Sequence, residues 1–266
     1  MMKDSFDKLR CLFYLVRHHG SVFSGKVRSL PPLVLWIFTL YQIFDPPIPS
    51  TLIQGYVAAA MWLFFAMVWF GYLFLSDFDM TTEHLLILQI NSRLLYVISK
   101  ILFLTVVCFA ISLLGALYPI IMDFAFGIIG LTLIADGVRL SDFFGALLLN
   151  FTVGTLGVSV AFLFHPNPSK NSDSFITLIM LVMFALMAFI KHQIFNFEGL
   201  FRYLLLIFTP VYEILRLFSD KSVFTVGDLA MTAIQGSIYF SIAMMLGYWL
   251  YSRRVYGPLL AKPESG

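Results

Sequence analysis

The chain has 266 residues, of which 60% are hydrophobic and only 12% are charged, and its formal net charge is +2. A water-soluble domain is normally about half apolar and a quarter charged, so this composition excludes a surface that faces water on all sides. It predicts a protein that is integral to a membrane, and the basic residues form no aromatic-interleaved patch that would indicate a nucleic-acid partner.

The first 29 residues predict an amphipathic helix that lies flat in the membrane interface. At about 100° per residue, the apolar side chains on one arc are Phe6, Leu9, Leu12, Phe13 and Val16. The opposite arc carries Lys3, Asp7, Arg10, Tyr14 and Arg17. Apolar residues at this spacing, with basic residues behind them, are typical of an interfacial helix. The alternative is a solvated leader segment.

Six apolar runs follow, and they predict an all-α integral membrane fold with six transmembrane helices. A bilayer core of about 30 Å requires roughly 20 apolar residues in a helix. The predicted spans lie at about 30–45, 54–75, 97–121, 143–164, 175–195 and 229–251. The apolar piece 124–135 is too short to span, so we expect it to be the end of the third helix or an outer re-entrant turn.

The distribution of lysine and arginine predicts the orientation of these spans. Cations gather before the first span, between the second and third, between the fourth and fifth, and in the tail at 252–266. Lysine and arginine concentrate on the cytoplasmic side of a membrane. With six spans these four locations share one side, which predicts a protein of the cell (plasma or inner) membrane with cytoplasmic N- and C-termini.

The segment 198–218, between the fifth and sixth spans, is apolar but carries Arg202, Glu213 and Arg216. A helix that faces lipid does not carry such charges cheaply, and broken backbone survives in a membrane only where protein or water covers it. We therefore expect an outer re-entrant segment that is broken near Thr209 and Pro210. A plain amphipathic outer loop is the alternative.

The sequence offers no catalytic chemistry. "SGKV" at 24–27 lacks the upstream glycine and the following serine or threonine of a phosphate-binding loop, so we expect no ATP hydrolysis by this chain. The five histidines show no metal-binding spacing and are expected at the surface or the interface. In the fourth predicted span, Gly154, Gly157 and Ser159 predict close helix packing rather than an intramembrane protease.

The loop at 76–96 combines helix-start residues with consecutive apolar ones. Thr81 can cap a helix, Glu83 suits its positive end, and four apolar residues follow at 85–88. Such a short helix must bury one face on its own bundle, and its other face then becomes a docking surface for a partner. Alternatively, the segment merely extends the second and third helices. The spacing leaves both open.

These residues resemble a known family. "SDFDMTTEHLLILQINSRLLYVISKIL" at 76–102 resembles the cytoplasmic loop of type-2 ATP-binding cassette (ABC) exporter permeases, although the family's glycine–threonine is Met80 and Thr81 here. The positions that match in order are Glu83, residues 85–88, Asn91, Ser92, Arg93, Ser99 and Lys100. "FTPVYEILRLF" at 208–218 resembles the family's proline, aromatic and Leu-Arg pattern before the last span.

The resemblance implies that the loop helix is a coupling helix that docks on a separate ABC ATPase subunit, which binds ATP and Mg. The ATPase-coupling residues it implies are Glu83, His84, Leu85, Leu86, Leu88 and Arg93. Glu83 and Arg93 are expected to make polar contacts there, or to pair internally with each other or with Lys100. A second cytoplasmic contact is implied at Asn167, Lys170 and Asp173, and an outer gate at Thr209, Pro210 and Tyr212.

The resemblance also implies a second permease copy, as a homodimer or heterodimer, in contact with membrane lipid. It implies export of an amphiphilic substrate, such as a peptide, lipid or drug. The competing hypothesis is an ATP-independent multispan protein, either a secondary carrier or an immunity or sensor protein. The absence of a central Asp or Glu from all six predicted spans weakens the carrier hypothesis.

Overall fold

The computed structural model describes residues 2–25, 30–44, 52–77, 80–128, 139–164, 171–194 and 210–260. Within these ranges all regular structure is helical, which confirms the predicted all-α class. The helices are α1 (Met2–Ser24), α2 (Leu30–Ile43), α3 (Leu52–Ser76), α4 (Met80–Ile90), α5 (Arg93–Ile128), α6 (Leu140–Leu163), α7 (Asn171–Ile194), α9 (Val211–Ser219) and α10 (Val226–Leu260).

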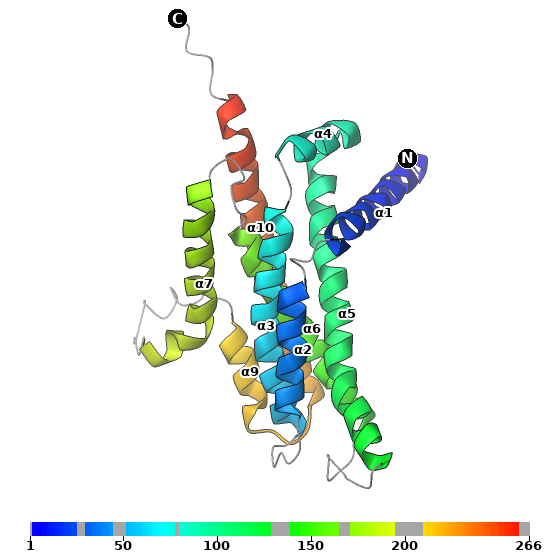
Figure 1. Ribbon diagram of the computed structural model, residues 1–266, viewed down its shortest axis with the longest axis vertical. Coiled ribbons are helices and arrows are strands. Elements are labelled where there is room, and N and C mark those ends of the chain that lie inside the picture. Colours follow the sequence, from blue (N-terminus) through cyan, green and yellow to red (C-terminus); the bar gives the residue numbers. More distant parts are fainter. Residues whose placement is uncertain are drawn as a thin grey trace, which may run out of the picture.

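The long helices run alternately along one bundle axis (Figure 1). In that view the chain descends through α2, rises through α3, descends through α5, rises through α6, descends through α7 and rises through α10. Consequently α1, α4 and the C-terminal half of α10 lie at the upper end of the bundle, and α9 lies at the lower end.

Four of the described helices are long and apolar enough to cross a membrane, so the chain has the character of a multi-pass membrane protein. They are Leu52–Ser76, Arg93–Ile128, Leu140–Leu163 and Val226–Arg253. The shorter apolar helix Leu30–Ile43 and the apolar stretch Thr177–Ala188 within α7 correspond to the first and fifth predicted spans. Their crossing of the membrane stays a prediction.

The central helix of the bundle is α6, which packs against α3, α5 and α10. All its residues from 152 to 162 are buried. The predicted close packing through small residues is confirmed at two glycines. A Cβ atom at Gly157 would lie 2.6 Å from the backbone oxygen of Phe64 in α3, and one at Gly154 would lie 2.5 Å from the Cys108 sulfur in α5.

Helix α5 is longer than the predicted third span at both ends. Its 36 residues, at about 1.5 Å per residue, give a rod of about 54 Å, which exceeds the roughly 30 Å hydrocarbon core of a bilayer. Because it continues to Ile128, the prediction that the piece 124–135 prolongs the third helix is confirmed for residues 124–128. Residues 129–138 lie outside the described ranges.

Helix α9 is the described part of the predicted re-entrant segment. Its side chains Val211, Ile214, Leu215 and Phe218 are buried, and the helix packs mainly on α3, whereas Arg216 is exposed. This is the pattern of an amphipathic helix that lies on the bundle. Residues 198–209, where the chain was predicted to dip into the membrane, lie outside the described ranges.

Candidate functional site

The short helix α4 lies at the upper end of the bundle, between the end of α3 and the start of α5, and packs on α5 (Figure 1). Asn91 ends it with φ of 52°, in the left-handed region that asparagine tolerates better than most residues. The Ser92 side-chain oxygen then accepts a hydrogen bond from the Leu95 backbone N–H at 3.4 Å, as expected just before a new helix. These two residues separate α4 from α5 and let the chain change direction between the two helices.

The inner face of α4 is held by Glu83, which is only 3% exposed. Its Oε1 atom forms an ion pair with Lys100 of α5, which is also buried. The Tyr96 hydroxyl donates to Oε1 at 3.4 Å, and the Tyr251 hydroxyl of α10 donates to Oε2 at 3.0 Å. Both carboxylate oxygens are therefore used, and a single α4 side chain connects α4 to α5 and α10.

The amino group of Lys100 also lies over aromatic rings. Its Nζ atom is 4.9 Å from the centre of the Tyr96 ring and 5.9 Å from that of Tyr251. A cation within about 6 Å of an aromatic face is attracted to it. The same two tyrosines thus contact both charges of the ion pair. These contacts offset part of the free-energy cost of removing the two charged groups from water.

A second polar contact joins α1 to the same turn of α5. His19 is fully buried, and its Nε2 atom lies 2.9 Å from the Ser99 hydroxyl oxygen. The Ser99 hydroxyl donates its only proton to the Tyr96 backbone carbonyl at 2.6 Å. Nε2 of His19 must therefore carry a proton and donate to Ser99, which fixes the tautomer of the neutral ring. The prediction that the histidines lie at the surface or interface is wrong for His19.

The docking of α1 should weaken in acid. Burial, reinforced by the positive charge of Lys100, lowers the pKa of His19 from 6.5 to about 3. In the unfolded chain the imidazole takes up its proton near pH 6.5, so between pH 6.5 and about 3 the unfolded state binds more protons. Above pH 6.5 the neutral ring makes its full contribution to the free energy of unfolding. Below pH 6.5 this free energy falls by about 1.4 kcal/mol per pH unit.

Comparing the unfolding free energy of the wild-type protein and His19→Gln in detergent at pH 7, 5 and 4 tests this expectation. We expect the difference in unfolding free energy between the wild type and His19→Gln to shrink as the pH falls, because glutamine does not titrate. The neighbouring His18 is exposed, so His18→Gln should retain the acid sensitivity. An identical pH dependence in wild type and His19→Gln would contradict the assignment.

The outer face of α4 is apolar and uncovered by any described part of the chain. Leu85 is 57% exposed and Leu88 is 75% exposed. These two leucines are three residues apart and therefore share one side of the helix, beside the exposed Thr81 and Gln89. Other exposed leucines, such as Leu102 and Leu114 of α5, lie along helices that are long and apolar enough to cross a membrane. Leu85 and Leu88 instead lie beyond the end of α3 with polar neighbours.

The remaining predicted coupling residues occupy other positions. Leu86 is half-buried against an apolar cluster that includes Leu15 of α1 and Tyr96. His84 is half-buried on the flank of α4, and Arg93 is exposed at the start of α5. The structure thus divides the predicted set: Glu83 and Leu86 face the bundle, whereas Leu85 and Leu88 face outward. Of the two pairings considered for Glu83, the structure has the one with Lys100.

The other predicted sites are described only in part. Asn167, Lys170 and Thr209 lie outside the described ranges, as does the side chain of Asp173 in α7. Pro210 and Tyr212 are half-buried at the start of α9. Helix α9 lies at the end of the bundle opposite α4, so these two residues are far from the coupling candidates (Figure 1).

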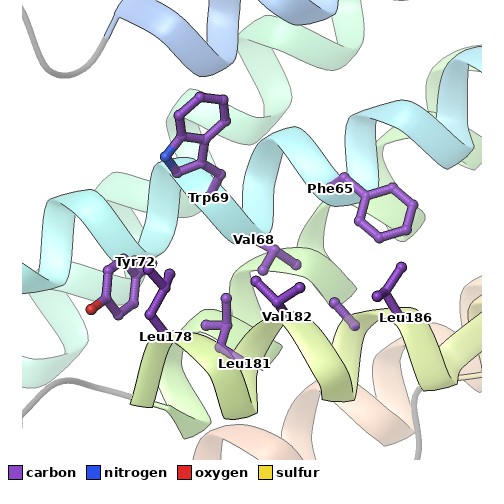
Figure 2. Close-up of a pocket in the computed structure, with 9 residues that line it drawn as sticks. Phe65, Val68, Trp69, Tyr72, Leu178, Leu181, Val182 and Leu186 are labelled. Carbon is purple, nitrogen blue, oxygen red and sulfur yellow. The ribbon is translucent and has the colours of Figure 1, made fainter. Parts of the chain in front are cut away.

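An apolar groove separates α3 from α7 at the side of the bundle. It has a volume of about 450 Å³ and is lined by Phe65, Val68, Trp69, Tyr72, Leu178, Leu181, Val182, Ala185 and Leu186. Figure 2 shows the α3 residues and the α7 residues lining it from opposite sides. Only the Tyr72 hydroxyl and the Trp69 indole nitrogen are polar side-chain groups in this lining, so the groove suits hydrocarbon rather than a polar ligand.

Sequence reasoning missed His19, Tyr96 and Tyr251 as members of the buried cluster. Two of these residues are distant in sequence from the groups that they contact: His19 is 80 residues from Ser99, and Tyr251 is 168 residues from Glu83. The available signal was Lys100, which falls within the predicted span at 97–121, because a lysine in a span requires an acidic partner.

Within the described ranges, no three side chains of the His, Cys, Asp and Glu types gather in a way that could hold a metal ion. The site is therefore best described as a helix anchored by a buried ion pair, with an apolar outer surface. No protein-family model and no curated protein matches this chain.

Proposed function

We propose that this chain is the permease subunit of an ATP-driven type-2 ABC exporter, and that α4 is its coupling helix. The observation that carries the proposal is the two-faced character of α4. Its inner face is fixed to α5 and α10 through Glu83, whereas its outer face presents Leu85 and Leu88. A helix that receives motion from a partner needs both an apolar docking surface and a firm connection to the bundle.

The connection supplies a route for mechanical coupling. When a docked ATPase displaces α4, the ion pair with Lys100 and the hydrogen bond from Tyr251 transmit the displacement to α5 and α10. Both of these helices pack on the central α6. ATP can shift the bundle between two conformations only if the contacts with the ATPase differ between them. We propose that these contacts lie on the α4 surface.

The arrangement of the ends supports the proposed orientation. Helix α1, α4 and the C-terminal half of α10 share one end of the bundle (Figure 1), which is the end where the sequence concentrates its cations. We assign this end to the cytoplasm of a plasma or inner membrane. A second permease copy and two ATPase subunits, which bind ATP and Mg, complete the proposed complex, and the gate at Thr209, Pro210 and Tyr212 faces outward.

The apolar groove between α3 and α7 supports an amphiphilic cargo. Its lining offers hydrocarbon and aromatic surface from Phe65, Trp69 and Leu181 but no buried charge. Such a surface can hold the apolar part of a lipid, peptide or drug while the polar part stays near water. The second proposed contact with the ATPase lies at Asn167, Lys170 and Asp173.

The test is co-purification of an ATP-hydrolysing subunit with the tagged chain from its native membrane, with the subunit identified by photolabelling with azido-ATP. We expect Leu88→Asp to lower its recovery at least tenfold, because a charge at the centre of an apolar contact costs roughly 2 kcal/mol or more. Leu140 provides a matched control, since it is 74% exposed at the opposite end of the bundle.

Leu140→Asp should leave recovery of the ATPase unchanged. Unchanged recovery with Leu88→Asp, or equal loss with both variants, would contradict the proposal. Absence of any photolabelled subunit from the wild-type preparation would favour an ATP-independent carrier or sensor instead.

A further inference from the structure

Helix α1 has three distinct faces, and one of them docks on the bundle. Leu15, His19 and Phe23 follow one another at four-residue intervals, and all three are buried. They pack against α5 and its neighbours. This face differs from the apolar arc that the sequence indicated, so a second apolar surface of α1 is left uncovered by the described chain.

That second surface consists of Leu9 and Phe13, which are 63% and 68% exposed. Directly beside it the structure has Arg10, Tyr14 and Arg17, which the helical pattern of the sequence placed on the opposite arc of α1. The five residues together line a shallow groove along the outer side of α1. Apolar side chains next to arginines therefore form one continuous surface. It has the order of groups found across a membrane interface, with hydrocarbon on one side and cations on the other.

The two arginines are well placed for phosphate. They are seven residues apart, so they lie on the same side of the helix about 10 Å from one another, with Tyr14 between them. Helix α1 contains the acidic residues Asp4 and Asp7 and the basic residues Lys3, Lys8, Arg10 and Arg17, so its formal net charge is +2. Guanidinium groups form bidentate hydrogen bonds with phosphate oxygens.

Helix α10 carries an arginine–tryptophan pair of the kind found at a membrane interface. On α10, the Arg253 guanidinium carbon lies 3.9 Å from the centre of the Trp249 ring, and Trp249 is 46% exposed. Tryptophan and arginine on the outside of a membrane protein are typical of the headgroup region. The C-terminal half of α10 and α1 share the upper end of the bundle (Figure 1).

We propose that the outer face of α1 binds anionic phospholipids, with the phosphates at Arg10 and Arg17 and the acyl chains against Leu9 and Phe13. This surface requires no ATPase partner, so the proposal is independent of the proposed transport function. Because the opposite face of the same helix holds the His19–Ser99 contact, bound lipid stabilises the docked position of α1.

The experiment places the purified full-length chain in nanodiscs that contain phosphatidylcholine and spin-labelled phosphatidylglycerol or phosphatidylcholine. Electron paramagnetic resonance then gives the relative association of the two labelled lipids with the protein. We expect a preference for phosphatidylglycerol that falls about fivefold for each of Arg10→Gln and Arg17→Gln, and that weakens with added salt. Arg10→Lys/Arg17→Lys should retain most of the preference.

Arg139→Gln is the matched control, because Arg139 is exposed at the start of α6, at the other end of the bundle. It should leave the preference unchanged. Circular dichroism and gel filtration confirm that each variant is folded. A preference for phosphatidylglycerol that survives the double Arg→Gln substitution, or that Arg139→Gln removes equally, would overturn the assignment. Wild-type protein without any preference would overturn it as well.

Discussion

Replacing Lys100 with methionine should destabilise the protein by about 3–5 kcal/mol, because it leaves the Glu83 carboxylate buried without a cation. Lys100 is 1% exposed and Glu83 is 3% exposed, so water cannot replace the missing charge. The loss of stability should be largest around α4, because this ion pair holds the inner face of α4 to α5. It is measured as the free energy of unfolding in mixed detergent micelles, together with the rate of tryptic cleavage at the exposed Arg93.

Two further variants separate the ion pair from general damage. Glu83→Gln/Lys100→Met removes both charges. The glutamine oxygen can still accept a hydrogen bond from one tyrosine hydroxyl, and its amide N–H can donate to the hydroxyl oxygen of the other, so most of the stability should return. Tyr251→Phe removes the hydrogen bond to Glu83 and should cost about 1–3 kcal/mol. If the double variant were as unstable as Lys100→Met, the shape of the lysine rather than its charge would be the cause.

Replacing Gly157 with leucine should cost about 3 kcal/mol or more by forcing α3 and α6 apart. A Cβ atom there would lie 2.6 Å from the Phe64 backbone oxygen and 3.1 Å from the Met67 Cβ atom. Overpacking of this kind typically costs 1–3 kcal/mol, and the cost rises when the nearest atom belongs to a backbone that cannot rotate away. Thermal unfolding in detergent, followed by circular dichroism, measures the effect.

Gly227 is the control for this substitution, because it lies in the first turn of α10 and a Cβ atom there would meet nothing within 4 Å. Gly227→Leu should therefore change the unfolding free energy by no more than about 0.5 kcal/mol. Equal stability of the two leucine variants would show that α3 and α6 tolerate separation at this point.

The positions of the apolar helices were largely predictable. The uncharged run at 54–75 corresponds to α3, and the segment at 143–164 corresponds to α6, because a membrane helix depends mainly on local composition and length. The limits of α5 were less accurate. Its polar first turn is stabilised by contacts with α1 and α4, which a hydropathy pattern does not contain.

At the candidate site, the sequence indicated α4 but not the contacts that hold it to α5 and α10. The caps and the apolar residues at 85–88 indicated a helix with two faces, and the exposure of Leu85 and Leu88 agrees with that hypothesis. The pattern did not decide which of the four apolar residues faced the bundle. It also assigned only one apolar face to α1, where Leu15 and Phe23 form a second.

By itself, the sequence determined the helical, membrane-protein character of this chain and where its long apolar helices lie; near Glu83 it left open a separate short helix or an extension of the neighbouring ones. These properties follow from the composition and periodicity of neighbouring residues. Only the tertiary structure decided that Glu83, Lys100 and Tyr251 meet in one buried cluster and that His19 joins it through Ser99. The reason is physical: such contacts depend on the relative rotation and height of helices that are distant in the chain, and packing of their side chains sets both.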